Sequence, residues 1–221
     1  MRHDRFVRGR PALTLLMSAL LLAASAFSGH AAGADPEARF QALLATAKAG
    51  DQPVDWQALR FAYADRPSFS VFGDGLDAVR KQMFAALSAK DYAGALSGAQ
   101  QIIGQDFVDA DAHLIVFICD QELGQPDSGR RDREIAVGLI RSMQTGDGKT
   151  PATALTVINV AEEYTYLRVN GLRSNSQALI HDGGHSYDLL NAVDQSGQPR
   201  PVYFLIDRVV ADEAKALATR K

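Results

Sequence analysis

Residues 141–160 read RSMQTGDGKTPATALTVINV, and the character of the chain changes within this stretch. Before Gly146, apolar residues recur at helical spacing. After Gly148, β-branched and aromatic residues gather in short runs separated by turn residues. Helices followed by strands in separate blocks are typical of the α+β class. The sequence therefore predicts a single α+β domain over residues 32–221, with a helical part at about 36–145 and a strand-rich part at about 151–221.

The helical part is divided by short breaks. We expect helices at 36–48, 56–63, 76–89, 91–104, 109–123 and 127–143. Connections this short require neighbouring helices to pack as antiparallel hairpins. Leu87 and its surroundings align with Leu123, 36 residues later, close to the 34-residue period of tetratricopeptide helix pairs. The pattern therefore predicts N-terminal antiparallel helical hairpins that are loosely tetratricopeptide-like, with a hint of a peptide-binding groove.

The strand-rich part predicts a small, mostly antiparallel sheet followed by a C-terminal helix at about 210–219. Candidate strands are 154–160, 165–169, 177–181, 186–192 and 201–206. Turn residues at 182–184 and 195–198 separate the last three runs. Residues 151–164 have a second interpretation, because Pro151 could open a helix that Thr150 caps.

The N-terminus has the order of a removable export signal. Residues 1–10 hold four Arg and one Asp, residues 12–27 are uncharged and mostly apolar, and small residues follow at 28–32. A membrane anchor is the rival interpretation, but a spanning helix needs roughly 20 apolar residues. We therefore expect cleavage near residue 31, a periplasmic or secreted protein, and no stable membrane span afterwards.

Charge and cysteine content narrow the function. Of 23 basic and 26 acidic residues, four Arg and one Asp lie in residues 1–31, so 19 basic and 25 acidic residues remain, a net charge of −6. Such a surface repels phosphate backbones, which argues against nucleic-acid binding. Cys119 is the single cysteine and sits in the apolar run 114–119, so it is expected to be a small buried hydrophobe rather than a nucleophile.

Two adjacent carboxylates, Glu162 and Glu163, are the first candidate site. Adjacent residues face different ways on a helix or a strand, so at most one is expected to point inward, near Tyr164, Asp188 or Arg141. A buried Glu tied to an Arg as a structural pair is favoured over general-acid chemistry.

Histidines supply the second candidate. His181 and His185 flank a turn, and Asp188 follows three residues on. Metal binding needs convergent ligands, whereas residues beside a tight turn often point to solvent, so no metal site is favoured. His113 begins an apolar helical run and is expected to be a satisfied, partly buried histidine.

The segment 146–150 ends in Gly-Lys-Thr, as a phosphate-binding loop does. Such a loop needs a glycine at position 143, where this chain has Met, and it should follow a buried strand rather than a helix. The segment is therefore interpreted as a helix end followed by an Asp147-Gly148 turn.

Several motifs in order carry a family resemblance. They include Asp55-Trp-Gln-Ala-Leu59-Arg60 with Tyr63, the run from Ile140 to Ala154, Glu162-Glu163-Tyr164, Tyr187-Asp188 and Tyr203-Phe204. Together they resemble an exported bacterial family known as a domain of unknown function, over about residues 40–206. Thr145 stands where Ser is expected before Gly-Asp-Gly. The resemblance implies one exported domain and brings no reaction, ligand or cofactor with it.

Two hypotheses of function follow. The leading one is a binding or interaction module for a peptide or protein of the cell envelope, using Tyr92, Arg141 and Tyr164 and no cofactor. The alternative is a periplasmic hydrolase with Glu163, His113, Asp147 and Asp188 around one cleft. No complete catalytic motif is present, so we lean towards the binding module.

Overall fold

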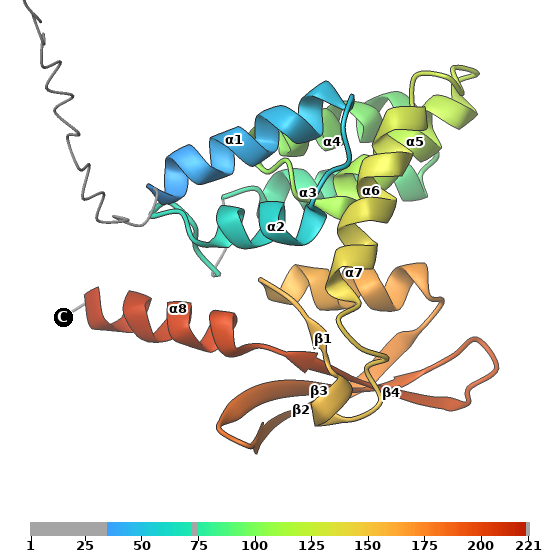
Figure 1. The fold of residues 1–221 in the computed structure, drawn as a ribbon. Coiled ribbons are helices and arrows are strands. Elements are labelled where there is room, and N and C mark those ends of the chain that lie inside the picture. The colour runs from blue at the N-terminus through green and yellow to red at the C-terminus, as the bar shows by residue number, and fades with distance from the viewer. Residues whose placement is uncertain (1–34, 72–74, 220–221) are drawn as a thin grey trace, which may run out of the picture. The chain divides into compact units, whose positions relative to one another are not determined.

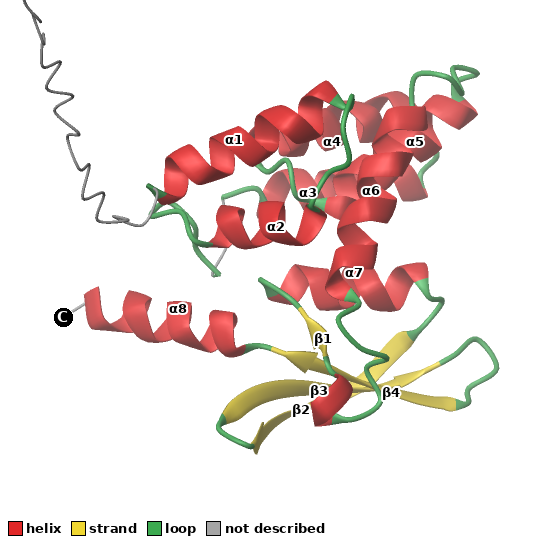
Figure 2. Ribbon diagram, viewed as in Figure 1, coloured by secondary structure: helices red, strands yellow, loops and turns green. Residues whose placement is uncertain are grey.

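The computed structural model describes residues 35–71 and 75–219. The expected signal peptide lies outside these residues. The helices of the described chain are α1 (Pro36–Ala49), α2 (Trp56–Ala64), α3 (Asp77–Ser88), α4 (Tyr92–Gln105), α5 (Ala110–Glu122), α6 (Arg130–Met143), α7 (Val160–Val169) and α8 (Asp207–Thr219). The strands are β1 (Leu155–Thr156), β2 (Arg173–Asp182), β3 (His185–Val193) and β4 (Pro199–Leu205) (Figures 1 and 2). The expected α+β class, with helices first, a mostly antiparallel sheet and a C-terminal helix, is confirmed.

Aspartates start many of these helices. Asp35, Asp55, Asp91 and Asp109 each accept a hydrogen bond from a backbone N–H of the first turn, which satisfies a donor that has no partner inside the helix. Neighbouring helices pack in sequence order from α3 to α6, and α1 packs on α2. One apolar core lies among α1, α2 and α6, and a second among α3, α4 and α5, where the buried Cys119 lies.

The sheet has the strand order β1-β4-β3-β2. β1 pairs with β4 in parallel, and the other two pairings are antiparallel. Leu190 and Phe204 are fully buried on one face of the sheet, where they pack with Leu167 of α7 in a third core. Because the strand order is β1-β4-β3-β2, the two edge strands are β2 and the two-residue β1.

Residues 151–169 differ from the expectation. The predicted strand at 165–169 is wrong, because these residues end α7. Of the strand predicted at 154–160, only β1 forms. The alternative long helix from Pro151 is also wrong, since only a single 3-10 turn forms at Pro151–Thr153, capped by Thr150. The Asn159 side chain accepts from the Glu162 N–H at 3.0 Å and caps α7. The β-branched and aromatic residues of this stretch are helical because α7 is packed on two sides.

Helix α7 lies between the helical array and the sheet (Figure 1). It contacts α5 on one side and β2 on the other. No helix of residues 35–71 and 75–219 is long and apolar enough to cross a bilayer.

Candidate functional site

Arg60 and Glu162 form a buried ion pair that joins α2 to α7. Arg60 Nε donates to Glu162 Oε1 at 2.7 Å, and Nη2 donates to Oε2 of the same carboxylate. Nη2 also donates to the Thr156 carbonyl at 3.0 Å, and Ile158 N–H donates to Glu162 Oε2 at 2.8 Å. Arg60 is 0% exposed, so the structural pairing expected for one of the two glutamates is present. The partner is Arg60 rather than Arg141.

Glu163 is also buried, so the expectation that at most one of the pair points inward is wrong. Adjacent helical residues face about 100° apart, and α7 is covered on both sides. Glu162 meets the helical array while Glu163 meets the sheet at Asp188. Among the described residues, neither carboxyl oxygen of Glu163 has a hydrogen-bond partner.

The Glu163–Asp188 contact changes the ionisation of Glu163. Burial, then the charge of Asp188 and then that of Glu162, raise the pKa of Glu163 to about 9. Glu163 is therefore a neutral acid at pH 7. Asp188 Oδ2 accepts from Gln177 Nε2 at 2.6 Å. Two of the four hydrolase candidates thus meet, and sequence spacing alone could not pair them.

The other two hydrolase candidates are held by partners of their own. His113 is 1% exposed, with Nδ1 at 2.6 Å from Asp132 Oδ1 and Nε2 at 3.0 Å from the Phe107 carbonyl. Asp147 accepts from Thr153 Oγ1 at 2.6 Å and from the Lys149 N–H at 3.1 Å. The Thr153 hydrogen bond, the Lys149 ammonium 2.9 Å from Asp147 Oδ2 and the Lys149 N–H lower the pKa of Asp147 to about 2. Both groups therefore stabilise local structure, His113 beside the α4–α5 connection and Asp147 in its turn.

The two turn histidines have separate partners as well. His185 Nδ1 is 2.6 Å from Asp207 Oδ2, and His181 Nδ1 is 3.2 Å from Ser186 Oγ. Over the described part of the chain, no three His, Cys, Asp or Glu side chains are grouped as metal ligands. The Asp207 contact links the β2–β3 hairpin to the start of α8.

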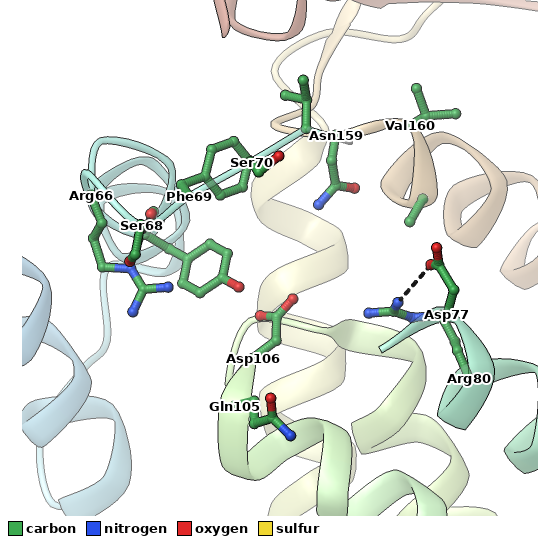
Figure 3. Close-up of a pocket in the computed structure, with 13 residues that line it drawn as sticks. Arg66, Ser68, Phe69, Ser70, Asp77, Arg80, Gln105, Asp106, Asn159 and Val160 are labelled. Atoms are coloured by element: carbon green, nitrogen blue, oxygen red, sulfur yellow. Dashed lines mark hydrogen bonds and ion pairs between the residues drawn. The ribbon is translucent and has the colours of Figure 1, made fainter. Parts of the chain in front are cut away.

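A cavity of about 550 Å³ opens beside the N-terminus of α7, lined from α2, α3, α4 and the segment after α2 (Figure 3). Its basic groups already have partners. Arg80 Nη2 donates to Asp109 at 2.9 Å, and Arg66 stacks on the rings of Phe40 and Tyr63. The cavity therefore offers little unpaired charge to a ligand.

A second groove, of about 710 Å³, runs between the start of α2 and the outer face of α6. Trp56 and Val54 line one side, and Arg133, Val137 and Arg141 line the other. The indole of Trp56 lies directly on Gly138, since a Cβ at that position would be 2.2 Å from Trp56 Nε1. A glycine in mid-helix costs stability, and here it makes room for the aromatic wall of the groove.

The acidic residues of this groove have hydrogen-bond partners inside the protein, whereas its arginines have no ion-pair partner among the described residues. Asp55 is used as the cap of α2, and Glu134 accepts from Arg131 at 3.0 Å. Arg133 lies 5.8 Å from the centre of the Phe117 ring. Neither Arg133 nor Arg141 makes an ion pair within the described ranges. The groove thus holds two arginines without an ion-pair partner in the described chain, beside two carboxylates that already have partners.

The three expected binding residues lie on different helices. Arg141 lines this groove, Tyr92 is partly buried against the core of α3, α4 and α5, and Tyr164 is 43% exposed on α7. Trp56 and Arg133 were missed by sequence reasoning. The i, i+4, i+8 spacing of Arg133, Val137 and Arg141 on one helix face was the available signal.

The described chain thus combines helical hairpins, a small sheet, a surface groove between α2 and α6, and two buried carboxyl groups at Glu163 and Asp188. Residues 44–215 match the family model described as a domain of unknown function (DUF4919), and the chain belongs to that family. No curated protein and no solved structure matches the chain.

Proposed function

We propose that the protein is an exported binding module of the cell envelope that holds an extended, acidic protein or peptide segment in the α2–α6 groove. The observation that carries the proposal is the state of the groove charges. Its carboxylates are engaged inside the protein and its arginines have no ion-pair partner in the described chain. A carboxylate group of the ligand would accept charge-assisted hydrogen bonds from the Arg141 guanidinium.

The dimensions of the groove suit an extended segment. Arg133 and Arg141 are eight residues apart on α6, which is roughly 12 Å along the helix axis. An extended chain covers this length in about four residues. Trp56 lies half-buried opposite the arginines and offers a rigid apolar surface of the kind that dominates binding energy at interfaces. The favoured ligand therefore has an apolar side chain flanked by carboxylates about four residues apart.

Synthetic peptides test this proposal. We would titrate a hexapeptide with two Glu residues four positions apart and a central Leu, alongside its Gln-substituted counterpart, and follow the emission of Trp56. The Glu peptide should bind, and added salt should weaken its binding. Arg141→Gln should reduce the affinity at least about tenfold, which corresponds to the loss of one charge-assisted contact.

Arg130→Gln is the matched control, because Arg130 lies on α6 outside the groove and pairs with Asp127. The Arg130→Gln variant should bind the Glu peptide with the same affinity as the unmodified protein. Equal binding of the Glu and Gln peptides, or equal losses in the Arg130 and Arg141 variants, would contradict the proposal.

A hydrolase is the second candidate, and the Glu163–Asp188 pair favours it. A neutral acid beside a carboxylate is the ionisation state that general acid–base catalysis needs. Glu163 is 0% exposed, however, and the cavities described above do not include it. An enzymatic role therefore requires α7 to move from the sheet. Turnover of peptide, ester or glycoside substrates that Glu163→Gln abolishes would favour this candidate over the binding module.

A further inference from the structure

The two edges of the sheet are unlike each other. At the β1 edge, Arg60 donates to the Thr156 carbonyl and Thr145 Oγ1 donates to the Ala154 carbonyl. The β2 edge is ten residues long, and within the described chain no strand pairs with its outer side (Figure 1). A long uncovered edge presents a row of backbone donors and acceptors that can pair with another strand.

The sequence of β2, RSNSQALIHD, lacks the usual protection of an exposed edge. It contains neither Lys nor Pro, the residues that most often prevent edge pairing. Its formally charged residues stand at its ends, Arg173 and Asp182, and neither forms an ion pair within the part of the chain that the structure describes. Leu179, in its middle, is 55% exposed. The edge therefore has an apolar centre and opposite charges at its two ends.

A β-bulge at 174–176 sets the register of these charges. Along β3, Arg173 lies opposite Val193 and Asp182 lies opposite His185. These two β3 positions are an even number of residues apart, so Arg173 and Asp182 present the same face and the same hydrogen-bonding orientation. Without the extra residue of the bulge, the two would have opposite orientations.

From this relationship we infer that the β2 edge pairs antiparallel with the β2 edge of a second copy of this chain, around a two-fold axis at Ala178. Ala178 lies opposite Leu189 of β3, midway between the β3 partners of Arg173 and Asp182. Residues opposite each other in an antiparallel pair must share their orientation. The axis at Ala178 therefore places Arg173 of each copy opposite Asp182 of the other, and the sheet continues across both copies.

The same axis covers the exposed leucine. Leu179 of one copy falls opposite Gln177 of the other, and the two Leu179 side chains become diagonal neighbours on one face of the extended sheet. The interface is isologous, so each favourable contact occurs twice. Because one strand pair is a small interface, the dimer is expected to form reversibly, with an affinity on the order of micromolar.

Sedimentation equilibrium over a wide range of concentration tests the dimer. The full chain should double its mass with rising concentration. Arg173→Glu places two acids opposite each other and should weaken dimerisation at least about tenfold. The exchange Arg173→Glu with Asp182→Arg should restore it, because the pair is then reversed but complementary. Lys81→Glu, on the distant and exposed side of α3, changes the charge equally and should leave the dimer intact.

A disulfide test fixes the register. Ala178→Cys places two thiols at the axis and should give a cross-linked dimer on mild oxidation, while the buried Cys119 stays unreacted. Ile180→Cys lies on the same face, but its two copies are offset by roughly 13 Å along the strands and should not cross-link. A protein that is monomeric at every concentration, or equal cross-linking of both variants, overturns the inference. The groove between α2 and α6 is not part of this edge. The outcome of the peptide titration is therefore independent of whether the dimer forms.

Discussion

Glu163 of α7 and Asp188 of β3 meet across the interface between helix and sheet, where the charge of Asp188 opposes the ionisation of Glu163. Burial and the Asp188 charge hold the pKa of Glu163 at about 9. Asp188 itself accepts a hydrogen bond from Gln177. Glu163 therefore keeps its proton at neutral pH in the place where α7 packs on the sheet.

This proton makes stability depend on pH in a defined direction. The folded-state pKa of Glu163 lies above the ordinary value of 4.5, so between pH 4.5 and 9 the folded protein binds more protons than the unfolded chain. Stability is then greatest at the acidic end of this window and falls as pH rises through it, by up to about 1.4 kcal/mol per unit. Glu163→Gln keeps the shape of the side chain and removes the proton, so its urea midpoint should fall less between pH 5 and 9.

Glu213→Gln is the control for this measurement, because Glu213 is exposed on α8 and should leave the slope unchanged. Asp188→Asn should also flatten the slope, since it removes the charge that opposes ionisation of Glu163. Parallel pH profiles for the unmodified protein and Glu163→Gln would show that the pair does not hold a proton.

The buried Arg60–Glu162 pair gives a second prediction. Removal of one partner, by Arg60→Met or Glu162→Leu, leaves the other charge buried and should lower the free energy of unfolding by about 3–5 kcal/mol. The double variant should recover part of this loss, but not all of it, because the Thr156 carbonyl and the Ile158 N–H also lose partners. Chemical denaturation measures all three variants. Additive losses in the double variant would mean that the two charges do not stabilise each other.

Gly138 and Trp56 give a third prediction that needs no knowledge of the ligand. The chain has one tryptophan, so its emission reports on the groove alone. Gly138→Ala would place a Cβ 2.2 Å from Trp56 Nε1, which should displace the indole towards solvent and shift its emission to the red. Gly104→Ala, in α4, meets nothing within 4 Å. This control should leave the emission unchanged and add about 0.5–1 kcal/mol of stability.

Cys119 gives a fourth prediction. Its thiol is 0% exposed in the core of α3, α4 and α5, and burial raises its pKa. Since the thiolate is the reactive form, an aromatic disulfide reagent should label the native protein at least about 100-fold more slowly than the urea-unfolded chain. Rapid labelling without denaturant would mean that this core opens readily.

Local patterns were sufficient to predict most of the fold. The four capping aspartates, the short breaks between helices and the turn glycines near residue 183 act within a few residues of themselves. The helices α1 to α6 and the strands β2 to β4 accordingly lie close to their expected positions. The prediction for residues 165–169 was wrong because their β-branched and aromatic side chains suit a strand. Packing on two sides of α7 makes these residues helical. Propensity is a weak bias that tertiary contacts override.

The candidate sites depended more on tertiary structure than the fold did. Residue patterns predicted a buried Cys119, a turn rather than a phosphate-binding loop after α6, and an arginine partner for one of the adjacent glutamates. They could not predict that this arginine is Arg60, 102 residues away, or that Glu163 meets Asp188, because both contacts depend on how distant elements pack. Periodicity specifies which face of an element is apolar, but the opposing element is set by how the helical array, α7 and the sheet stack.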